Sequence, residues 1–326
     1  MSQVDLSSGC GPTIACREAF GQALLELGRE VPNLLVLDAD LGSSTRASVF
    51  ASEFPERFIQ VGIAEQNMVG MAAGLALAGW IPVTSTLACF ASKRALDQVR
   101  ASVAQPNLNV KITGGYSGIL AGKTGITHQS IEDLAIFRAM PQMTVLAPSD
   151  GIETRAAIRA AVEYRGPVYI RLTRDPMPTV MPPDYVFHIG KAVPMRSGSD
   201  VALLSTGWML LPTLEAATIL SGEGVQATVL HLPSLKPFDA EAVVEVARHT
   251  GAVVTVEDHS ILGGLGAAVA EILSERMPTW MRRVGICDCY AESAPNEDLL
   301  TKYGLTPANI AAQARELLAS RTASRA

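Results

Sequence analysis

The sequence predicts an α/β fold made of two consecutive, doubly wound domains whose sheets are mostly parallel. Three observations support this prediction. Short, almost continuously apolar runs alternate with longer amphipathic stretches, as in parallel sheets that are covered by helices on both faces. The chain has 326 residues, which is long enough for two domains. Hydrophobic residues make up 48% and charged residues 18%, which excludes a mainly disordered protein.

The first domain is predicted to span residues 13–175, after an N-terminal tail at residues 1–12. Its strands are expected where short aliphatic and β-branched runs are bounded by turn residues. These runs are residues 34–38, 58–61, 81–85, 109–113, 144–147 and 168–172. Its helices are expected where apolar residues recur at helical spacing. These segments are residues 14–27, 65–78, 93–104, 130–140 and 151–164.

A proline-rich break at residues 176–192 predicts an extended linker. The alternation then restarts, which predicts a second, smaller domain at residues 193–320 and a tail at residues 321–326. Its predicted strands are residues 201–205, 226–230, 252–256 and 284–287. Its predicted helices are residues 209–220, 240–249, 264–276 and 307–319.

Charge and composition exclude several classes of partner. The net charge is −6 and no long basic run occurs, so we expect neither a nucleic acid nor a membrane partner. The N-terminus lacks the basic and apolar regions of a secretory signal. The apolar stretch at residues 68–83 is too short to span a membrane and is interrupted by Pro82. The odd number of cysteines, five, favours a reducing compartment, so we expect a cytoplasmic protein.

The sequence predicts no metal site within this chain. Cys287 and Cys289 have the spacing of a ligand pair, but no histidine or second cysteine pair lies nearby. We therefore expect ordinary thiols at both positions.

A carboxylate stands where the strand at residues 58–61 gives way to a helix, in the run Gln60-Val-Gly-Ile-Ala-Glu65-Gln-Asn-Met68. Glu65 falls in the first helical turn, where the helix dipole favours an anion, and alone it would be an ordinary helix-terminal carboxylate. Its surroundings are more specific. Residues 62–83, with the string IAEQN before a helix of small residues, resemble the pyrimidine-binding domain of transketolases. The resemblance extends over nearly the whole chain.

The resemblance implies that the cofactor is thiamine diphosphate. Glu65 would hydrogen-bond N1′ of its aminopyrimidine ring and thereby promote removal of the proton from thiazolium C2, while the chemistry itself belongs to the cofactor. Ile63 and Asp40, the latter in an Ala-Asp-Leu motif, match positions near the cofactor. A carboxylate buried against a ring nitrogen is expected to have a perturbed pKa.

Phe90 matches an aromatic residue that holds the aminopyrimidine ring in transketolases. Leu87 stands where the family has another aromatic residue, and Lys93 replaces a third. The resemblance therefore implies a cofactor pocket formed by Phe90 and Leu87 that departs from the family pattern.

A glycine-rich loop at residues 113–133 ends in Thr-His-Gln before an acidic helix. It resembles the transketolase loop that presents a histidine to substrate oxygens, which implies a catalytic role for His128. Two substrate-binding positions of this loop depart from the family. Thr124 replaces an aspartate that contacts a sugar hydroxyl, and Tyr116 replaces a phosphate-binding histidine. An unusual sugar substrate is therefore expected.

Arg17, Ser44 and Arg174 match the phosphate-binding positions of the family. Each alone is typical of a solvated surface residue. Together they imply a phosphorylated or otherwise anionic substrate, because planar guanidinium groups suit bidentate phosphate contacts. In the second domain, residues 256–266 resemble a turn of the transketolase C-terminal domain, where His259 is expected to be structural. His188, His231 and His249 are assigned no role.

The sequence lacks the Gly-Asp-Gly motif, with a following asparagine, that binds the diphosphate and a divalent metal in complete transketolases. The resemblance therefore implies the small subunit of a split transketolase, assembled as α2β2 with an N-terminal subunit that binds the diphosphate and Mg²⁺ or another divalent metal. Its reaction would transfer a two-carbon ketol unit from a ketose, expected to be a sugar phosphate, to an aldehyde.

Three alternatives remain open at this point. The chain resembles the β subunit of a 2-oxoacid dehydrogenase E1 component in architecture and length. It also has similarity to 1-deoxyxylulose-5-phosphate synthase, although an N-terminal domain is missing. A non-catalytic assembly subunit with the same fold is the third alternative, and the intact Glu65 argues against it.

Overall fold

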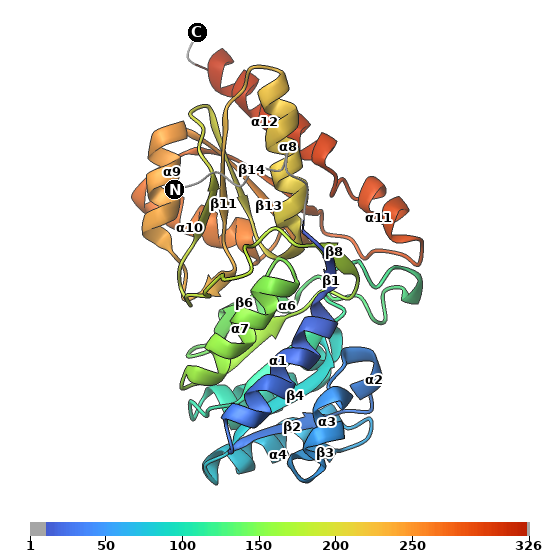
Figure 1. The fold of residues 1–326 in the computed structure, drawn as a ribbon. Helices are drawn as coiled ribbons and strands as arrows, with labels where there is room; N and C mark the ends of the chain where they lie inside the picture. Colours follow the sequence, from blue (N-terminus) through green and yellow to red (C-terminus); the bar gives the residue numbers. More distant parts are fainter. Residues whose placement is uncertain (1–10, 325–326) are drawn as a thin grey trace.

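Two mostly parallel sheets, each covered by helices on both faces, organise the molecule (Figure 1). This arrangement comes from a computed structural model, which describes residues 11–324. It confirms the predicted α/β class with two doubly wound domains. Most of the predicted N-terminal tail, residues 1–10, lies outside the described residues.

The first sheet has seven strands in the order β12-β6-β7-β5-β4-β2-β3. Six of them are parallel, and each lies within two residues of a predicted strand: β2 (Leu34–Asp38), β3 (Phe58–Gln60), β4 (Ile81–Leu87), β5 (Lys111–Gly115), β6 (Thr144–Leu146) and β7 (Val168–Arg171). The seventh, β12 (Ser234–Lys236), comes from the second half of the chain and pairs antiparallel with β6.

Strand β2 shows why this sheet needs helices on both faces. Its side chains alternate in direction, so Leu34 and Val36 enter one hydrophobic core while Leu35 and Leu37 enter another. The first core is covered by α1 (Cys16–Glu30), α3 (Ser48–Glu53) and α7 (Gly151–Glu163), with the short α2 (Gly42–Thr45) nearby. The second is covered by α4 (Glu65–Leu77), the segment 90–104 and α6 (Asp133–Ala139).

The predicted helix at residues 93–104 begins earlier and is mostly a π-helix. It consists of η3 (Phe90–Arg94), α5 (Leu96–Gln98) and η4 (Val99–Ala104). The Ala95 N–H donates to the carbonyl of Phe90, five residues earlier, at 3.2 Å. Such wide turns are frequent at functional sites because they shift the direction of the side chains that follow.

The second sheet has five strands in the order β14-β13-β10-β11-β9. These are β14 (Trp280–Ile286), β13 (Ala252–Ser260), β10 (Val201–Ser205), β11 (Ala227–His231) and the antiparallel β9 (Val193–Arg196). Its helices are α8 (Leu210–Gly222), α9 (Ala240–Thr250), α10 (Leu265–Arg276), α11 (Asn296–Lys302) and α12 (Pro307–Ala323). Helix α12 continues three residues into the predicted C-terminal tail.

The predicted linker is more ordered than its proline content suggested. Its first residues form β8 (Pro176–Pro178), which pairs antiparallel with β1 (Thr13–Ala15). Further along, Met181 and Phe187 are buried in two different hydrophobic cores. The linker is therefore packed onto both domains. None of the helices in residues 11–324 is long and apolar enough to cross a membrane.

A buried histidine–carboxylate pair also joins the two domains. His231, at the end of β11, lies 2.8 Å from the carboxylate of Glu153 in α7, and both side chains are fully buried. Burial opposes ionisation of Glu153, but His231 and the bonds from Ser149 hold the pKa of this carboxyl below its usual value. No local pattern assigns His231 a role, because its partner lies 78 residues away.

Candidate functional site

Glu65 is buried at the start of α4, with only 1% of its side chain exposed. The helix N-terminus stabilises its negative charge. Both carboxylate oxygens accept hydrogen bonds from Nη1 of Arg94, at 2.8 and 2.9 Å. The same guanidinium lies over the ring of Phe90, with its carbon 4.1 Å from the ring centroid. Arg94 therefore joins Glu65 to Phe90.

His128 packs against the same aromatic ring in a T-shaped arrangement. The centroids of Phe90 and His128 are 5.7 Å apart at an interplanar angle of 67°. Nδ1 of His128 is 2.9 Å from the hydroxyl of Thr127. The Cys89 thiol donates to the Thr127 carbonyl at 3.6 Å, which ties the loop to the end of β4. The structure thus brings Glu65, Phe90 and His128 to one place.

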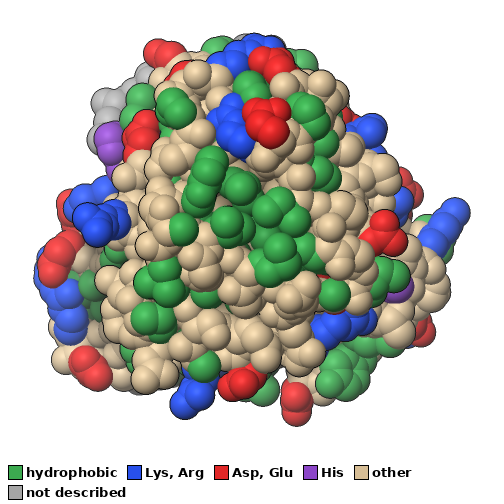
Figure 2. Space-filling view, turned by 90° about the horizontal axis from the view of Figure 1, so that it is seen from below, with side chains coloured by type: hydrophobic (Ala, Val, Ile, Leu, Met, Phe, Trp, Pro, Cys, Tyr) green, Lys and Arg blue, Asp and Glu red, His purple; other side chains and the backbone are tan. Residues whose placement is uncertain are grey.

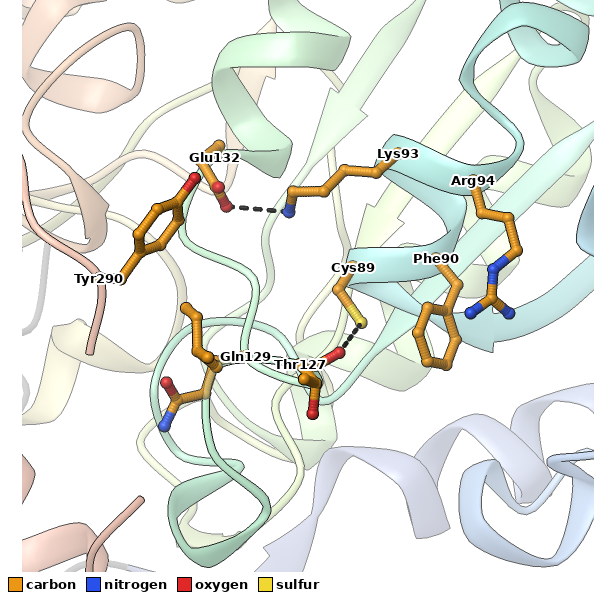
Figure 3. A pocket seen from close by; sticks show the side chains of 9 residues that line it. Cys89, Phe90, Lys93, Arg94, Thr127, Gln129, Glu132 and Tyr290 are labelled. Atoms are coloured by element: carbon orange, nitrogen blue, oxygen red, sulfur yellow. Dashed lines mark hydrogen bonds and ion pairs between the residues drawn. The ribbon is translucent and has the colours of Figure 1, made fainter. Parts of the chain in front are cut away.

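A pocket of about 540 Å³ opens beside Phe90 (Figure 3). Figure 3 shows that the neighbouring side chains Lys93 and Arg94 point in different directions. Lys93 reaches across to Glu132, with 2.9 Å between the charged atoms, whereas Arg94 lies beside Phe90. Tyr290 of the second domain stands on the far side. Both domains therefore contribute to the walls of this pocket.

The predicted anion-binding residues form a second group. Nη1 of Arg17 donates to the Ser44 carbonyl at 3.4 Å, and the Arg174 guanidinium lies 4.9 Å from the ring centroid of Tyr116. Arg17 and Tyr116 also line one cavity of about 10 Å³, which has room for a single water molecule. Within the described residues, Nε of Arg17 is buried without a hydrogen-bond partner. An anion or a water would satisfy such a donor.

The other predicted site residues differ in how far they are exposed to solvent. Asp40 is exposed, with a positive φ of 61°, and its N–H donates to Gln60. Ile63 is exposed just before α4, whereas Leu87 is buried at the end of β4. The exposed Thr124 donates its hydroxyl hydrogen to the Ala121 carbonyl at 2.7 Å, within its own loop. Their roles stay predictions.

The second domain holds the loop that carries His128. Asp258, fully buried in β13, accepts hydrogen bonds from the Ile119 N–H at 3.1 Å and from the indole N–H of Trp208 at 2.7 Å. Gly118 fits above this carboxylate, since a Cβ there would lie only 1.7 Å from it. Burial raises the pKa of Asp258 to about 6, although Arg171 opposes the shift. The start of the loop is therefore fixed by a side chain of the other domain.

The end of the same loop is also fixed across the domain boundary. The buried Arg171 donates to the Asp133 carboxylate at 2.9 Å and to the Asp258 carbonyl at 2.6 Å. His259 accepts a hydrogen bond at Nε2 from the Ala135 N–H at 3.4 Å, which caps the first turn of α6. Burial lowers the pKa of His259 to about 4, so the ring is neutral at pH 7. His259 thus serves the interface between the domains.

Sequence reasoning missed Arg94 and Asp258. Each stands in a run that carries predicted residues, Arg94 four residues after Phe90 and Asp258 in the segment 256–266. Their partners lie 29 and 139 residues away, and spacing along the chain carries no signal for contacts of that kind.

Two family models match the chain: the transketolase pyrimidine-binding domain over residues 12–179 and the transketolase C-terminal domain over residues 190–310. The 6-deoxy-6-sulfo-D-fructose transketolase subunit SqwH of Clostridium sp. is 45% identical, over 92% of this chain and 94% of that protein. An apulose-4-phosphate transketolase subunit of Phocaeicola vulgatus is 38% identical, over 94% of this chain and 98% of that protein. A solved structure of a split gene transketolase, described as an inactive beta4 tetramer, matches with a TM-score of 0.88 and 50% identity. The match covers 94% of this chain and 99% of that chain.

Replacing Trp208 with Phe tests the attachment of the His128 loop. Phe keeps most of the buried ring but leaves the Asp258 carboxylate without its indole donor. We expect the free energy of unfolding to fall by about 1–3 kcal/mol. Amide hydrogens of residues 117–131 should exchange faster, measured by mass spectrometry. The matched control is Trp280→Phe, at a site 45% exposed, where both quantities should stay unchanged. Unaltered exchange in the loop of Trp208→Phe would contradict this account.

Proposed function

The chain belongs to the transketolase family, and we propose that it is the C-terminal subunit of a two-chain transketolase that uses thiamine diphosphate. The proposed reaction moves a two-carbon ketol unit from a ketose to an aldehyde. One observation carries the proposal: Arg94 joins the buried carboxylate of Glu65 to the ring of Phe90, and Phe90 packs against His128. The chain also spans nearly the full length of relatives that are named as transketolase subunits.

The residues around Glu65 fit the aminopyrimidine end of this cofactor. A buried carboxylate suits the ring nitrogen N1′, with which Glu65 would share a proton, and Phe90 offers an aromatic face. Asp40, Ile63 and Leu87 are assigned to the same site from the family pattern. When bound, thiamine diphosphate supplies the nucleophilic carbon that carries the two-carbon unit.

His128 is assigned to proton transfer at the substrate oxygens. The hydroxyl of Thr127 engages its Nδ1, so Nε2 is the nitrogen that we assign to the substrate. The contact of His128 with Phe90 supports this assignment, because Phe90 is assigned to the cofactor. Asp258 accepts a hydrogen bond from the Ile119 N–H and Arg171 donates one to the Ser130 carbonyl, and these two bonds hold the loop that carries His128.

Arg17, Ser44, Tyr116, Thr124 and Arg174 are assigned to the substrate. Nε of Arg17, which has no hydrogen-bond partner among residues 11–324, and the guanidinium of Arg174 beside Tyr116 favour an anionic end group. The names of the two relatives point the same way, because one sugar carries a sulfo group and the other a phosphate. We therefore propose a phosphorylated or sulfonated sugar as substrate.

A separate N-terminal subunit would hold the diphosphate together with Mg²⁺ or another divalent metal, in an α2β2 assembly. Helix α4 offers a surface for it. Gly70 and Gly74 lie on its exposed side, and nothing lies within 4 Å of a Cβ built on either. Ile63 and Leu77, 74% and 75% exposed, flank them. Figure 2 views this end of the molecule and shows hydrophobic side chains gathered at its centre. Such an apolar surface is typical of a protein interface.

The subunit proposal predicts that activity requires assembly. The purified chain with thiamine diphosphate and Mg²⁺ should transfer no ketol unit, and addition of the diphosphate-binding subunit should restore transfer. Gly74→Arg should leave the isolated fold intact, because the site is open, but should weaken subunit association at least about tenfold, as measured by analytical ultracentrifugation. Gly222→Arg is the control, since it is equally open on α8. Robust turnover by the isolated chain would refute the proposal.

Glu65→Gln tests the cofactor role. Gln has nearly the same size but cannot hold a proton in the way that a carboxylic acid does. In the assembled enzyme without substrate, exchange of the cofactor C2 proton for deuterium, followed by quenched-flow NMR, should slow by orders of magnitude. Turnover should fall for every donor substrate alike. A variant that binds cofactor and exchanges this proton at the wild-type rate would remove Glu65 from the mechanism.

Arg174→Ala tests recognition of the anionic end. KM for a phosphorylated or sulfonated aldose should rise roughly 10–100-fold, which corresponds to about 1.5–3 kcal/mol for a charge-assisted contact. KM for the uncharged aldose of the same length should change little. Arg165→Ala, at an exposed position, is the control. An equal rise in KM for the charged and the uncharged aldose would show that Arg174 does not bind the anionic group.

A further inference from the structure

Arg94 makes two contacts at once that a bound aminopyrimidine would also need. Its Nη1 donates to both oxygens of Glu65, at 2.8 and 2.9 Å. Its planar guanidinium lies over the Phe90 ring, 4.1 Å from the centroid. A guanidinium and an aminopyrimidine are both flat, nitrogen-rich groups that can donate to a carboxylate and pack on an aromatic face. The side chain of Arg94 therefore makes the contacts that the proposed function assigns to the cofactor ring.

We propose that Arg94 is a displaceable counter-ion of Glu65, which holds the aminopyrimidine position until the cofactor enters and thereby sets the cofactor affinity. This inference rests on the proposed function, because it takes Glu65 and Phe90 as the cofactor residues. Arg94 is a positioning residue here, since it acts through Glu65.

The burial of the Glu65 carboxylate explains why a counter-ion is present. Glu65 is 1% exposed, and a buried carboxylate without a partner is strongly unfavourable. Arg94 supplies the missing charge while the cofactor is absent. Its own side chain is 45% exposed, so the guanidinium can move into solvent and be hydrated there when it leaves Glu65. The pair is asymmetric: the carboxylate is fixed and the cation is free to leave.

The surroundings give Arg94 room to move. It lines the pocket of about 540 Å³, and Figure 3 shows its guanidinium at the margin of that pocket, beside Phe90. The neighbouring cation, Lys93, is engaged with Glu132 on another side and does not compete for Glu65. Arg94 is the last residue of the π-helix η3, whose wide turn sets the direction of this side chain.

A displaceable counter-ion and a purely structural ion pair predict opposite effects of mutation. If Arg94 must leave before the cofactor binds, its removal destabilises only the cofactor-free enzyme, and cofactor affinity rises. If the pair remains in the bound state, its removal destabilises both states or weakens binding.

Arg94→Met separates these outcomes, because Met keeps the apolar contact with Phe90 and removes the charge. The protein is the complex of this chain with its diphosphate-binding subunit, titrated with thiamine diphosphate and Mg²⁺ by calorimetry. We expect the Kd for thiamine diphosphate to fall about tenfold. The Tm without cofactor should fall, and the rise in Tm on saturation should exceed that of the wild type.

Two controls show that the effect passes through Glu65. In a Glu65→Gln background, Arg94→Met should no longer tighten binding, because no carboxylate remains for Arg94 to pair with. Arg100→Met removes an exposed arginine from the same helical segment. It should change neither the Kd for thiamine diphosphate nor the Tm without cofactor. If Arg94→Met fails to fold, Arg94→Gln replaces it, and the Kd for thiamine diphosphate should also fall, because Gln removes the positive charge that pairs with Glu65.

Three results would be decisive. A Kd that is unchanged or higher in a folded Arg94 variant would overturn the inference. Tightening that persists in the Glu65→Gln background would overturn it as well. A wild-type complex that binds no thiamine diphosphate would instead refute the proposed function, so the two failures are distinguishable.

Discussion

A buried arginine holds the two domains in one arrangement. Arg171 is buried at the end of β7, and its donors reach the Asp133 carboxylate and the carbonyls of Ser130 and Asp258. A guanidinium in the protein interior is tolerated only when its charge and its donors are satisfied. Asp133 of the first domain supplies the opposite charge, and the Asp258 carbonyl of the second domain accepts the shortest of these bonds, at 2.6 Å. Arg171 therefore links the first sheet to β13, together with the pair of Glu153 and His231 and the strand pairing of β6 with β12.

The loop that carries His128 depends on the same arrangement. Its side chains Ile119, Leu120 and Ile131 are buried in the hydrophobic core of the second domain, although the loop belongs to the first. Apolar packing and the carboxylate of Asp258 therefore act together on one segment. The second domain, which contributes none of the proposed catalytic side chains, shapes the site by fixing the loop between its two anchored ends.

Local patterns predicted most of the regular structure, because strands that are buried on both faces of a sheet consist of nearly continuous apolar residues. Strand β2 was predicted at both ends, and α4 to within one residue. The π-helical turns at Phe90–Arg94 escaped prediction, because their apolar spacing resembles that of an α-helix. The resemblance to transketolases predicted Glu65, Phe90 and His128 as site residues. Arg94 and Asp258 were missed because their roles arise only when distant segments meet.

Strand β12 has a consequence for any attempt to express the first domain alone. This strand belongs to the second half of the chain but pairs with β6 and closes one edge of the first sheet. A fragment that stops at the linker would leave the backbone N–H and C=O groups of β6 open to other chains. Unprotected edges of this kind template intermolecular strand pairing and aggregation. The first domain therefore depends on the second to protect its sheet edge, and a useful truncation must keep residues 234–236 with the first sheet.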